Sequence, residues 1–272
     1  MKLKVEDIEF NLLLDESNYD QTKIPVIFLH GFTGAAEDWQ FILNKLPSRF
    51  YPVAVDLIGH GKTDSPVNPS YYTCTSIVRQ LDSIFTQLGF NNIIIVGYSM
   101  GGRVALSYSL THPHRIKASV LESATAGIQD ICSKKERVEL DYLLAEKIKN
   151  EGVESFLDFW FDTPLFESLK NLPDFLEMKK KRLKNNVTGL SNSLMNFSTG
   201  LMMSYWEKIS SLNFPVLLIS GENDKKYTDI NKLMKIKFPN ALHSSIPDCG
   251  HNVHLEKPEV FTKLVSEFLT TV

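Results

Sequence analysis

Cysteines are scarce in this sequence, and their positions exclude two common structural uses. The 272 residues include three cysteines, Cys74, Cys132 and Cys249, which lie far apart and form no Cys-x-x-Cys pair. A disulfide framework or a zinc knuckle needs several suitably spaced cysteines. We therefore expect three reduced thiols, and the sequence predicts neither a metal site nor a cofactor.

An excess of positive charge is also lacking. Lysine and arginine number 29, aspartate and glutamate 32, and the formal net charge is -3. Binding to nucleic acid or to anionic membranes needs a concentrated basic surface. The densest basic run, residues 179–184, is interpreted mainly as a solvated helix face. Neither nucleic acid nor a membrane is therefore predicted as a partner, and the pattern does not indicate an oligomeric state.

Long apolar runs are missing as well. Residues 1–7, MKLKVED, hold acidic side chains where a secretory signal would need an apolar core, and no later run is long enough to span a bilayer. We therefore expect a cytoplasmic protein without membrane insertion. With 43% hydrophobic residues, the chain can bury one large core and a small inserted subdomain.

What is present is an alternation of short apolar runs with amphipathic stretches in the first half of the chain. The runs predicted to be strands are residues 25–29, 51–55, 93–96 and 118–121. Strands that are apolar on both faces and separated by helices indicate a mostly parallel sheet covered by helices on both faces. The predicted fold class is therefore α/β.

The strand pattern stops after residue 127 and returns near the end of the chain. Residues 133–211 are rich in Lys, Glu, Leu and Phe with helical periodicity. Breaks in this helical pattern are expected near Gly152, Pro164, Pro173 and Gly189. Further strands are predicted at 215–219 and 242–246, and a last helix at 258–269. We expect a core of residues 1–128 and 212–272, interrupted by a helical cap of residues 129–211.

The most specific motif is GYSMG at residues 97–101, between the apolar run 93–96 and a helical stretch that begins at Gly102. A serine on so sharp a strand-to-helix turn has a strained backbone, and small residues two positions before and after it let strand and helix approach closely. This arrangement is typical of a nucleophile elbow. It predicts Ser99 as the reactive side chain at the edge of the sheet.

Two later residues complete a candidate catalytic set. A serine hydroxyl needs an imidazole to take its proton and a carboxylate to hold that imidazole. Asp224 and His251 each follow a predicted strand, so both are expected at the same sheet edge as Ser99. The competing acids are Glu222, Asp229, which is expected to cap a helix, and Asp248, and the competing histidine is His254.

The segment LHGFTG at residues 29–34 follows the first buried strand and fits one half of an oxyanion hole. One backbone amide would come from Met100, directly after the serine, and the other from Phe32 in this loop. Losing such a donor costs about 3 kcal/mol of transition-state stabilisation. His30 is expected to support the turn by hydrogen bonds to backbone.

A second glycine-rich segment, GHGKT at residues 59–63, ends like a phosphate-binding loop. The first glycine of such a loop would fall at Asp56, whose side chain would obstruct the backbone cradle and repel phosphate. Nucleotide binding is therefore not predicted, and these glycines are expected to shape a loop at the sheet edge.

These motifs resemble the α/β-hydrolase superfamily across nearly the whole chain. The matching segments are residues 30–31, 56–61, 97–101, 221–224 and 250–251. A narrower resemblance is to the 2-succinyl-6-hydroxy-2,4-cyclohexadiene-1-carboxylate (SHCHC) synthase family of menaquinone biosynthesis. It is carried by GYSMGGR at 97–103, LESATAGI at 121–128, GENDKKY at 221–227, and the cap around Arg137, Trp160 and residues 182–190.

The narrower resemblance implies a lyase that eliminates pyruvate from 2-succinyl-5-enolpyruvyl-6-hydroxy-3-cyclohexene-1-carboxylate. The triad would remove a ring proton without forming an acyl-enzyme. Because this small-molecule substrate carries three carboxylates, the resemblance implies cations at the pocket. The positions that match the family's substrate-binding residues are Arg103, Arg137, Tyr98, Trp160 and Lys184, or Arg182 if the register slips by two. A lysine at position 184 departs from the family, which has arginine there.

The same residues leave other functions open. A carboxylesterase or a hydrolase of carbon-carbon bonds would use the same triad, with Ser99 as nucleophile or base. A binding protein on this scaffold would not need the triad, so the complete set argues against it. Arg103 favours the lyase, because a guanidinium one helical turn beyond Ser99 can hold a carboxylate through two hydrogen bonds. The alternative for Arg103 is a surface side chain paired with an acid.

Overall fold

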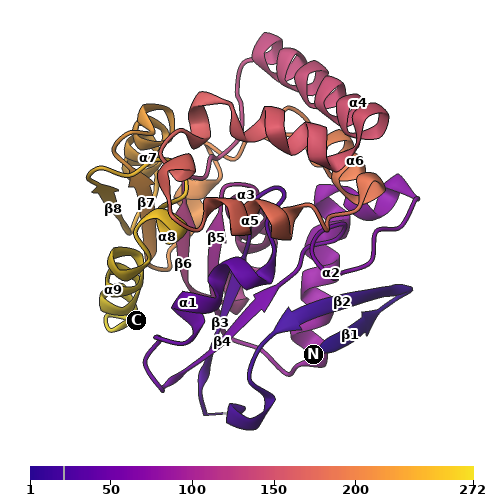
Figure 1. The fold of residues 1–272 in the computed structure, drawn as a ribbon. Helices are drawn as coiled ribbons and strands as arrows, with labels where there is room; N and C mark the ends of the chain where they lie inside the picture. Colours follow the sequence, from indigo (N-terminus) through magenta and orange to yellow (C-terminus); the bar gives the residue numbers. More distant parts are fainter. Residues whose placement is uncertain (21) are drawn as a thin grey trace.

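A computed structural model describes residues 1–20 and 22–272 of the chain (Figure 1). Its centre is an eight-stranded sheet with the strand order β1-β2-β4-β3-β5-β6-β7-β8. The strands are β1 Lys2–Val5, β2 Ile8–Leu13, β3 Ile24–Leu29, β4 Phe50–Val55, β5 Ile93–Tyr98, β6 Ile116–Glu122, β7 Val216–Gly221 and β8 Ala241–Ile246. Neighbouring strands from β4 to β8 pair in parallel. The α/β fold class predicted from the sequence is confirmed.

Helices cover both faces of this sheet (Figure 1). They are α1 Gln40–Leu43, α2 Cys74–Gln87, α3 Met100–Thr111, α7 Lys225–Lys237, α8 Val253–Glu256 and α9 Pro258–Leu269. Along β5, Ile93 and Ile95 belong to the core that packs on α2 and α3, whereas Ile94 and Val96 belong to the core on the α9 side. Since successive side chains of a strand point to opposite faces, an uninterrupted apolar strand serves both cores.

The sequence patterns missed the first two strands. β1 and β2 pair antiparallel at one edge of the sheet, and β2 joins β4. Ile8, Phe10 and Leu12 of β2 are buried, whereas Glu9 between them is exposed and Asn11 is partly buried. A half-solvated edge strand has no continuous apolar run, so it lacks the pattern of a strand that is buried on both faces.

Three helices lie between β6 and β7 and cover one end of the sheet (Figure 1). They are α4 Ile131–Phe161, α5 Phe175–Arg182 and α6 Val187–Asn196, and we call them the cap helices. They enclose a separate apolar cluster that includes Ile148, Phe156 and Leu190. The helical character predicted for residues 133–211 is confirmed up to Asn196, whereas residues 197–208 form turns and irregular segments.

Two predicted breaks in the cap have different outcomes. Gly152 has a φ of 83°, which interrupts the helical backbone within α4. Gly189 does not mark a break, because it lies within α6 and packs closely on the core. A Cβ at Gly189 would lie 2.3 Å from the Gly59 carbonyl oxygen, so the glycine is required for this contact.

Short 3-10 turns link the longer elements. They are Glu16–Asn18, Ala36–Trp39, Pro69–Tyr72, Pro113–Arg115, Pro164–Phe166, Leu169–Asn171 and Ile209–Ser211.

Among the residues described, no helix combines the length and apolar character that a bilayer span requires.

Candidate active site

Ser99 occupies the sharp turn between β5 and α3. Its φ of 49° and ψ of -104° lie outside the regions that most residues adopt. The turn is possible because its neighbours are glycines: a Cβ at Gly97 would lie 2.4 Å from the Gly101 carbonyl oxygen, and one at Gly101 would lie 2.1 Å from that of Leu29. The backbone N–H of Ser99 donates to the Glu122 carbonyl at 2.8 Å. These contacts hold a strained serine at the carboxyl end of the sheet.

The structure brings Ser99, His251 and Asp224 together. His251 Nε2 lies 3.1 Å from Ser99 Oγ, and His251 Nδ1 lies 2.6 Å from Asp224 Oδ2. His251 and Asp224 are buried, with 2% and 8% of their surface exposed. With Nδ1–H donating to the carboxylate, Nε2 is left as an acceptor for the Ser99 hydroxyl. The three residues thus have the arrangement that serine activation requires.

The competing acids do not reach this histidine. Glu222 and Asp248 are exposed. Asp229 was expected to cap a helix, but it lies within α7, and Asp224 itself is the N-cap of that helix, accepting from Tyr227 N–H at 3.2 Å. Asp224 therefore combines two functions that the sequence analysis assigned to different residues.

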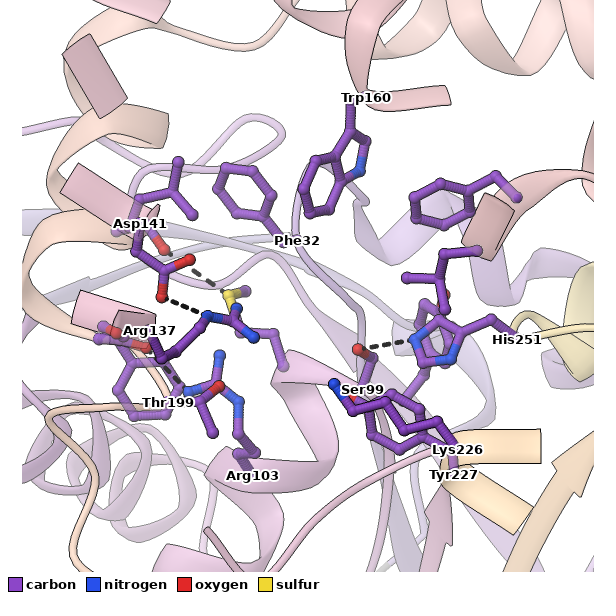
Figure 2. A pocket seen from close by; sticks show the side chains of 18 residues that line it. Phe32, Ser99, Arg103, Arg137, Asp141, Trp160, Thr199, Lys226, Tyr227 and His251 are labelled. Carbon is purple, nitrogen blue, oxygen red and sulfur yellow. Dashed lines mark hydrogen bonds and ion pairs between the residues drawn. The ribbon is translucent and has the colours of Figure 1, made fainter. Parts of the chain in front are cut away.

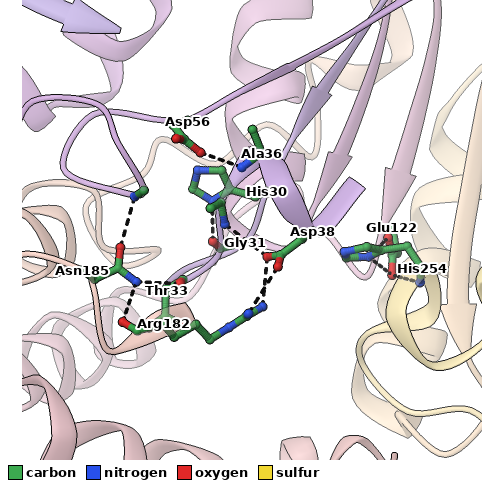
Figure 3. Close-up of polar contacts among 12 residues, drawn as sticks. His30, Gly31, Thr33, Ala36, Asp38, Asp56, Glu122, Arg182, Asn185 and His254 are labelled. Carbon is green, nitrogen blue, oxygen red and sulfur yellow. Dashed lines mark hydrogen bonds and ion pairs between the residues drawn. The ribbon is translucent and has the colours of Figure 1, made fainter. Parts of the chain in front are cut away.

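The competing histidine, His254, is hydrogen-bonded to a buried carboxylate. Its Nδ1 lies 2.8 Å from Glu122 Oε2, and both side chains are almost fully buried. Its ring stacks on Trp39 at a centroid distance of 4.0 Å. Figure 3 shows the pair, which links β6 to α8, the helix that follows His251. His254 therefore contributes to packing and does not contact Ser99.

His30 supports the turn after β3, as predicted. Its Nδ1 donates to the Gly31 carbonyl at 2.7 Å (Figure 3). Its Nε2 accepts from Leu57 N–H at 3.0 Å. Burial lowers the pKa of this imidazole below its usual value. His30 is therefore a neutral hydrogen-bonding residue of the loop.

The two amides predicted for an oxyanion hole lie beside Ser99. Met100 is the first residue of α3, and Phe32 follows Gly31, where a Cβ would lie 2.4 Å from the Tyr98 ring. Within residues 1–20 and 22–272, no hydrogen bond is formed by the N–H of either Phe32 or Met100. Both donors are therefore available to a ligand.

A pocket of about 140 Å³ opens above Ser99. Figure 2 shows Ser99 and His251 on one side, Arg103, Arg137 and Asp141 on the other, and the rings of Phe32 and Trp160 above. Ser99, Arg103 and Phe32 come from the core, and Arg137, Asp141 and Trp160 come from the cap helix α4. A ligand in this pocket would be enclosed between the two.

Arg103 is buried at this pocket, with 9% of its surface exposed. Its Nη1 donates to the Phe197 carbonyl at 2.8 Å, and its guanidinium lies 4.6 Å from the centroid of the Phe197 ring. No carboxylate in the described part of the chain forms an ion pair with it, so the alternative of a surface arginine paired with an acid is wrong. Burial, followed by the nearby Arg137, lowers the pKa of Arg103 to about 10. The side chain remains a cation at neutral pH, ready for an anionic ligand.

Arg137 reaches the same wall from α4. Its Nε donates to Asp141 Oδ2 at 2.8 Å, one helical turn further along. Asp141 is 1% exposed and also lines the pocket. The pocket therefore holds two arginines and one carboxylate on the wall opposite His251 (Figure 2).

Tyr98 and Trp160 both line the pocket. The Tyr98 ring lies 5.3 Å from the His251 ring, and burial raises the pKa of its phenol well above the usual value. Trp160 Nε1 is buried and has no hydrogen-bond partner among the described residues. An unpaired indole N–H at a pocket is a donor that a ligand can use.

Arg182 and Lys184 are not placed at this pocket, which corrects the prediction made for them. Arg182 donates through both terminal nitrogens to Asp38, at 2.9 and 3.2 Å, and the pair is largely buried (Figure 3). With Lys184 it lines a separate hollow of about 110 Å³ between α5 and the core loops. The terminal nitrogens of Arg182 that would bind a substrate carboxylate are therefore occupied by Asp38, which lies 144 residues away in the sequence.

Asp56, which excluded a phosphate-binding loop, supports the loops near this second hollow. Its carboxylate accepts from Ala36 N–H at 2.6 Å and from Lys62 N–H at 2.9 Å. A Cβ at Gly61 would lie 2.3 Å from the same carboxylate. The glycine-rich segment thus wraps a carboxylate of its own chain.

Ten of the residues that line the pocket are not among those predicted from the sequence. They include Asp141, Thr199, Lys226 and Tyr227. The spacing of two of them indicates a place near the site: Asp141 follows Arg137 by four residues, one helical turn, and Lys226 follows Asp224 by two. Thr199 lies in an irregular segment after α6, where residue type alone gives no indication.

In residues 1–20 and 22–272, no group of three or more His, Cys, Asp or Glu side chains is arranged to hold a metal ion. The chemistry available to the site from these residues is proton transfer, nucleophilic attack and anion binding.

Comparisons with known proteins agree with the fold. Residues 24–258 match the family described as alpha/beta hydrolase fold. A Bacillus subtilis protein that carries the SHCHC synthase name provisionally is 41% identical over 250 residues, covering 91% of this chain and 90% of that protein. An Enterobacter sp. (strain 638) SHCHC synthase is 27% identical over 245 residues, covering 90% of this chain and 91% of its own. The structure of MenH from S. aureus matches with a TM-score of 0.90 and 28% identity, covering 96% of this chain and 98% of that one.

Proposed function

Because the chain belongs to the alpha/beta hydrolase fold family, we propose a specific member of it: an SHCHC synthase of menaquinone biosynthesis. It eliminates pyruvate from 2-succinyl-5-enolpyruvyl-6-hydroxy-3-cyclohexene-1-carboxylate. Support comes from the 41% identity to the Bacillus subtilis relative and the close match to MenH. The observation that carries the proposal within the molecule is the pair of arginines, Arg103 and Arg137, across the pocket from Ser99.

In the proposed reaction Ser99 acts as a base. His251 takes the hydroxyl proton, and Asp224 stabilises the imidazolium that forms. The serine oxygen then removes the ring proton at C2, next to the succinyl carbonyl. The electron pair of that bond forms the C2–C3 double bond, the former C3–C4 pair moves to C4–C5, and the C5–oxygen bond breaks. The enolpyruvyl group leaves as the enolate of pyruvate, and the ring becomes the conjugated diene. The proton on the His251 imidazolium passes to the methylene carbon of the enolate, which gives pyruvate and restores the neutral imidazole.

The amides of Phe32 and Met100 would stabilise the charge that develops during proton removal. Taking a proton next to a ketone moves negative charge onto the succinyl carbonyl oxygen, and donors fixed beforehand at that position lower the barrier. Both N–H groups are without a partner among the described residues, so no existing hydrogen bond must be broken. The loss of one such donor typically costs about 3 kcal/mol.

The arginines and Trp160 suit a ligand with several carboxylates. Burying the Arg103 cation without a carboxylate partner is costly, and a bound carboxylate would offset that cost. Lys226 adds a further cation to the pocket lining, and Trp160 Nε1 adds an unpaired donor. A neutral ester would leave these groups without partners.

The alternative function is a carboxylesterase or a hydrolase of carbon-carbon bonds. The same Ser99, His251 and Asp224 arrangement would serve acyl transfer, with Ser99 attacking a carbonyl carbon. Arg103 favours the lyase, because its buried guanidinium has no carboxylate partner among the described residues and an ester pocket has no need of a buried cation. The SHCHC synthase proposal also includes a helical cap of residues 129–211 that closes over the substrate, and a cytoplasmic location.

The two functions are separated by following two substrates with one enzyme preparation. Pyruvate release from the enolpyruvyl substrate is measured beside hydrolysis of a 4-nitrophenyl ester. The proposal expects kcat/KM for pyruvate release to exceed that for the ester by at least 1,000-fold, about 4 kcal/mol in the barrier. Rapid ester turnover with an acyl group trapped on Ser99, and no pyruvate release, would establish the hydrolase instead.

A further inference from the structure

The carboxylate of Asp141 has one oxygen that its own chain does not use. Oδ2 accepts from Arg137 Nε at 2.8 Å, while Oδ1 is buried and has no hydrogen-bond partner in the described part of the chain. Asp141 is 1% exposed, and it lines the pocket that contains Ser99. A buried carboxylate oxygen is costly to leave unpaired. A ligand group that donates a hydrogen bond would remove this cost.

Arg137 offers the complementary groups beside it. A guanidinium has five N–H donors, and the Nε–H is used by Asp141. The four N–H groups on its terminal nitrogens form no hydrogen bond within residues 1–20 and 22–272. Arg137 and Asp141 lie one helical turn apart on α4, so an acceptor and a set of charged donors stand next to each other on the pocket wall (Figure 2).

We propose that Arg137 and Asp141 together bind the neighbouring carboxylate and hydroxyl of the substrate ring. In the SHCHC name the carboxylate is on C1 and the hydroxyl on C6, which are adjacent ring carbons. The hydroxyl donates to Asp141 Oδ1, and the carboxylate accepts from the terminal nitrogens of Arg137. The inference rests on the proposed function, and it adds a subsite for the hydroxyl.

The charges on this wall set the direction of binding. Asp141 repels a carboxylate, so an anionic group is placed on the Arg137 side and a neutral donor on the Asp141 side. A ligand without the hydroxyl leaves Oδ1 unpaired while bringing its carboxylate into the same pocket. Sites built to pair a ligand hydroxyl reject analogues that lack it by large factors, because the site's own polar group is left without a partner.

The test compares two ligands in two proteins by isothermal titration calorimetry. The ligands are SHCHC and 2-succinylbenzoate, which has the same ring carboxylate and succinyl group but no hydroxyl. The quantity measured is the ratio of their dissociation constants, for wild type and for Asp141→Asn. Glu139→Gln is the matched control, since Glu139 is an exposed acid on the same helix.

We expect wild type and Glu139→Gln to bind SHCHC at least tenfold more tightly than 2-succinylbenzoate. In Asp141→Asn the charged acceptor is replaced by a neutral amide, and the ratio is expected to fall to about threefold or less. Removing the negative charge of Asp141 changes the affinity for both ligands through the carboxylates that they share. The change in the ratio of the two dissociation constants therefore reports the contribution of the hydroxyl. An unchanged ratio in Asp141→Asn would overturn the proposal.

A second measurement needs no substitution and covers the case in which Asp141→Asn does not fold. Wild type is titrated with the 6-deoxy analogue of SHCHC, which keeps the diene ring. At least a tenfold weaker affinity than for SHCHC is expected, and equal affinities would contradict the hydroxyl subsite. The proposed lyase function fails if folded wild type releases no pyruvate. The hydroxyl subsite fails if the affinity ratios are as stated above, so the two failures are measured separately.

Discussion

Asp224 holds His251 from the first position of a helix. Its Oδ2 lies 2.6 Å from His251 Nδ1, while its Oδ1 accepts from the Tyr227 N–H at the start of α7. The helix N-terminus and the imidazole therefore hold one carboxylate from two directions. This arrangement orients His251 toward Ser99 before any ligand binds.

Asp224→Asn is expected to lower kcat for pyruvate release by roughly 10³- to 10⁴-fold, because an amide cannot stabilise the imidazolium or hold the required tautomer. Asparagine caps helices as well as aspartate does, so the thermal unfolding midpoint should change little. Steady-state kinetics and calorimetry measure the two effects. A kcat within tenfold of wild type would exclude the proposed function of Asp224.

Arg103→Met is expected to reduce kcat/KM by roughly 10- to 150-fold, the value of a charge-assisted contact of about 1.5–3 kcal/mol. Arg103→Lys should fall between methionine and wild type, because lysine keeps the charge and loses the planar fork. Kinetics of pyruvate release for the three proteins provide the comparison. Wild-type kinetics in Arg103→Met would remove the main support for a substrate with several carboxylates.

Arg182→Met is expected to act on stability. It leaves the Asp38 carboxylate unpaired beneath α5, and breaking a buried pair in this way lowers the free energy of unfolding by about 3–5 kcal/mol. Lys184→Met, which changes an exposed side chain two residues later, should have little effect. Urea unfolding measures both variants. If Arg182→Met kept its stability but raised KM strongly, Arg182 would be a substrate-binding residue after all.

His60 is expected to make the fold sensitive to acid. Burial, followed by the neighbouring His30, lowers the pKa of His60 to about 3. The unfolded chain therefore binds a proton near pH 6.5 that the folded protein excludes, and stability falls as the pH drops below 6.5 toward 3. Between pH 7 and pH 5 this one group should cost about 2 kcal/mol.

The histidine at position 60 is tested by urea unfolding at these two pH values. His60→Phe should lose less free energy of unfolding between pH 7 and pH 5 than wild type, whatever its stability at pH 7. His114→Gln, which changes an exposed histidine, should keep the wild-type difference. Equal differences for wild type and His60→Phe would show that His60 does not cause the acid sensitivity.

The features that the sequence predicted well are those defined by short segments. The elbow is recognisable because Gly97, Ser99 and Gly101 must occupy one tight turn, and the core strands because both faces of the sheet are covered. The order of Asp224 and His251 could be inferred because parallel strands end at the same edge. Local steric needs and the rules of parallel sheets were sufficient for these predictions.

The features that the sequence could not give depend on pairs distant along the chain. The ion pair of Arg182 with Asp38 spans 144 residues, and the hydrogen bond between His254 and Glu122 spans 132. Nothing in either local segment indicates its partner, so Arg182 was assigned to the substrate. The edge strand β2 was missed for a different reason, since its pattern alternates with solvent.

The proposal that Ser99 is the base of a pyruvate-eliminating lyase is tested most directly by pyruvate formation from the enolpyruvyl substrate. Wild type and Ser99→Ala are compared, each verified as folded by circular dichroism. We expect rapid release by wild type, a rate at least 10³-fold lower in Ser99→Ala, and no covalent adduct on wild type in intact-mass spectra taken during turnover. Absence of pyruvate from folded wild type, or release by Ser99→Ala at the wild-type rate, would contradict it.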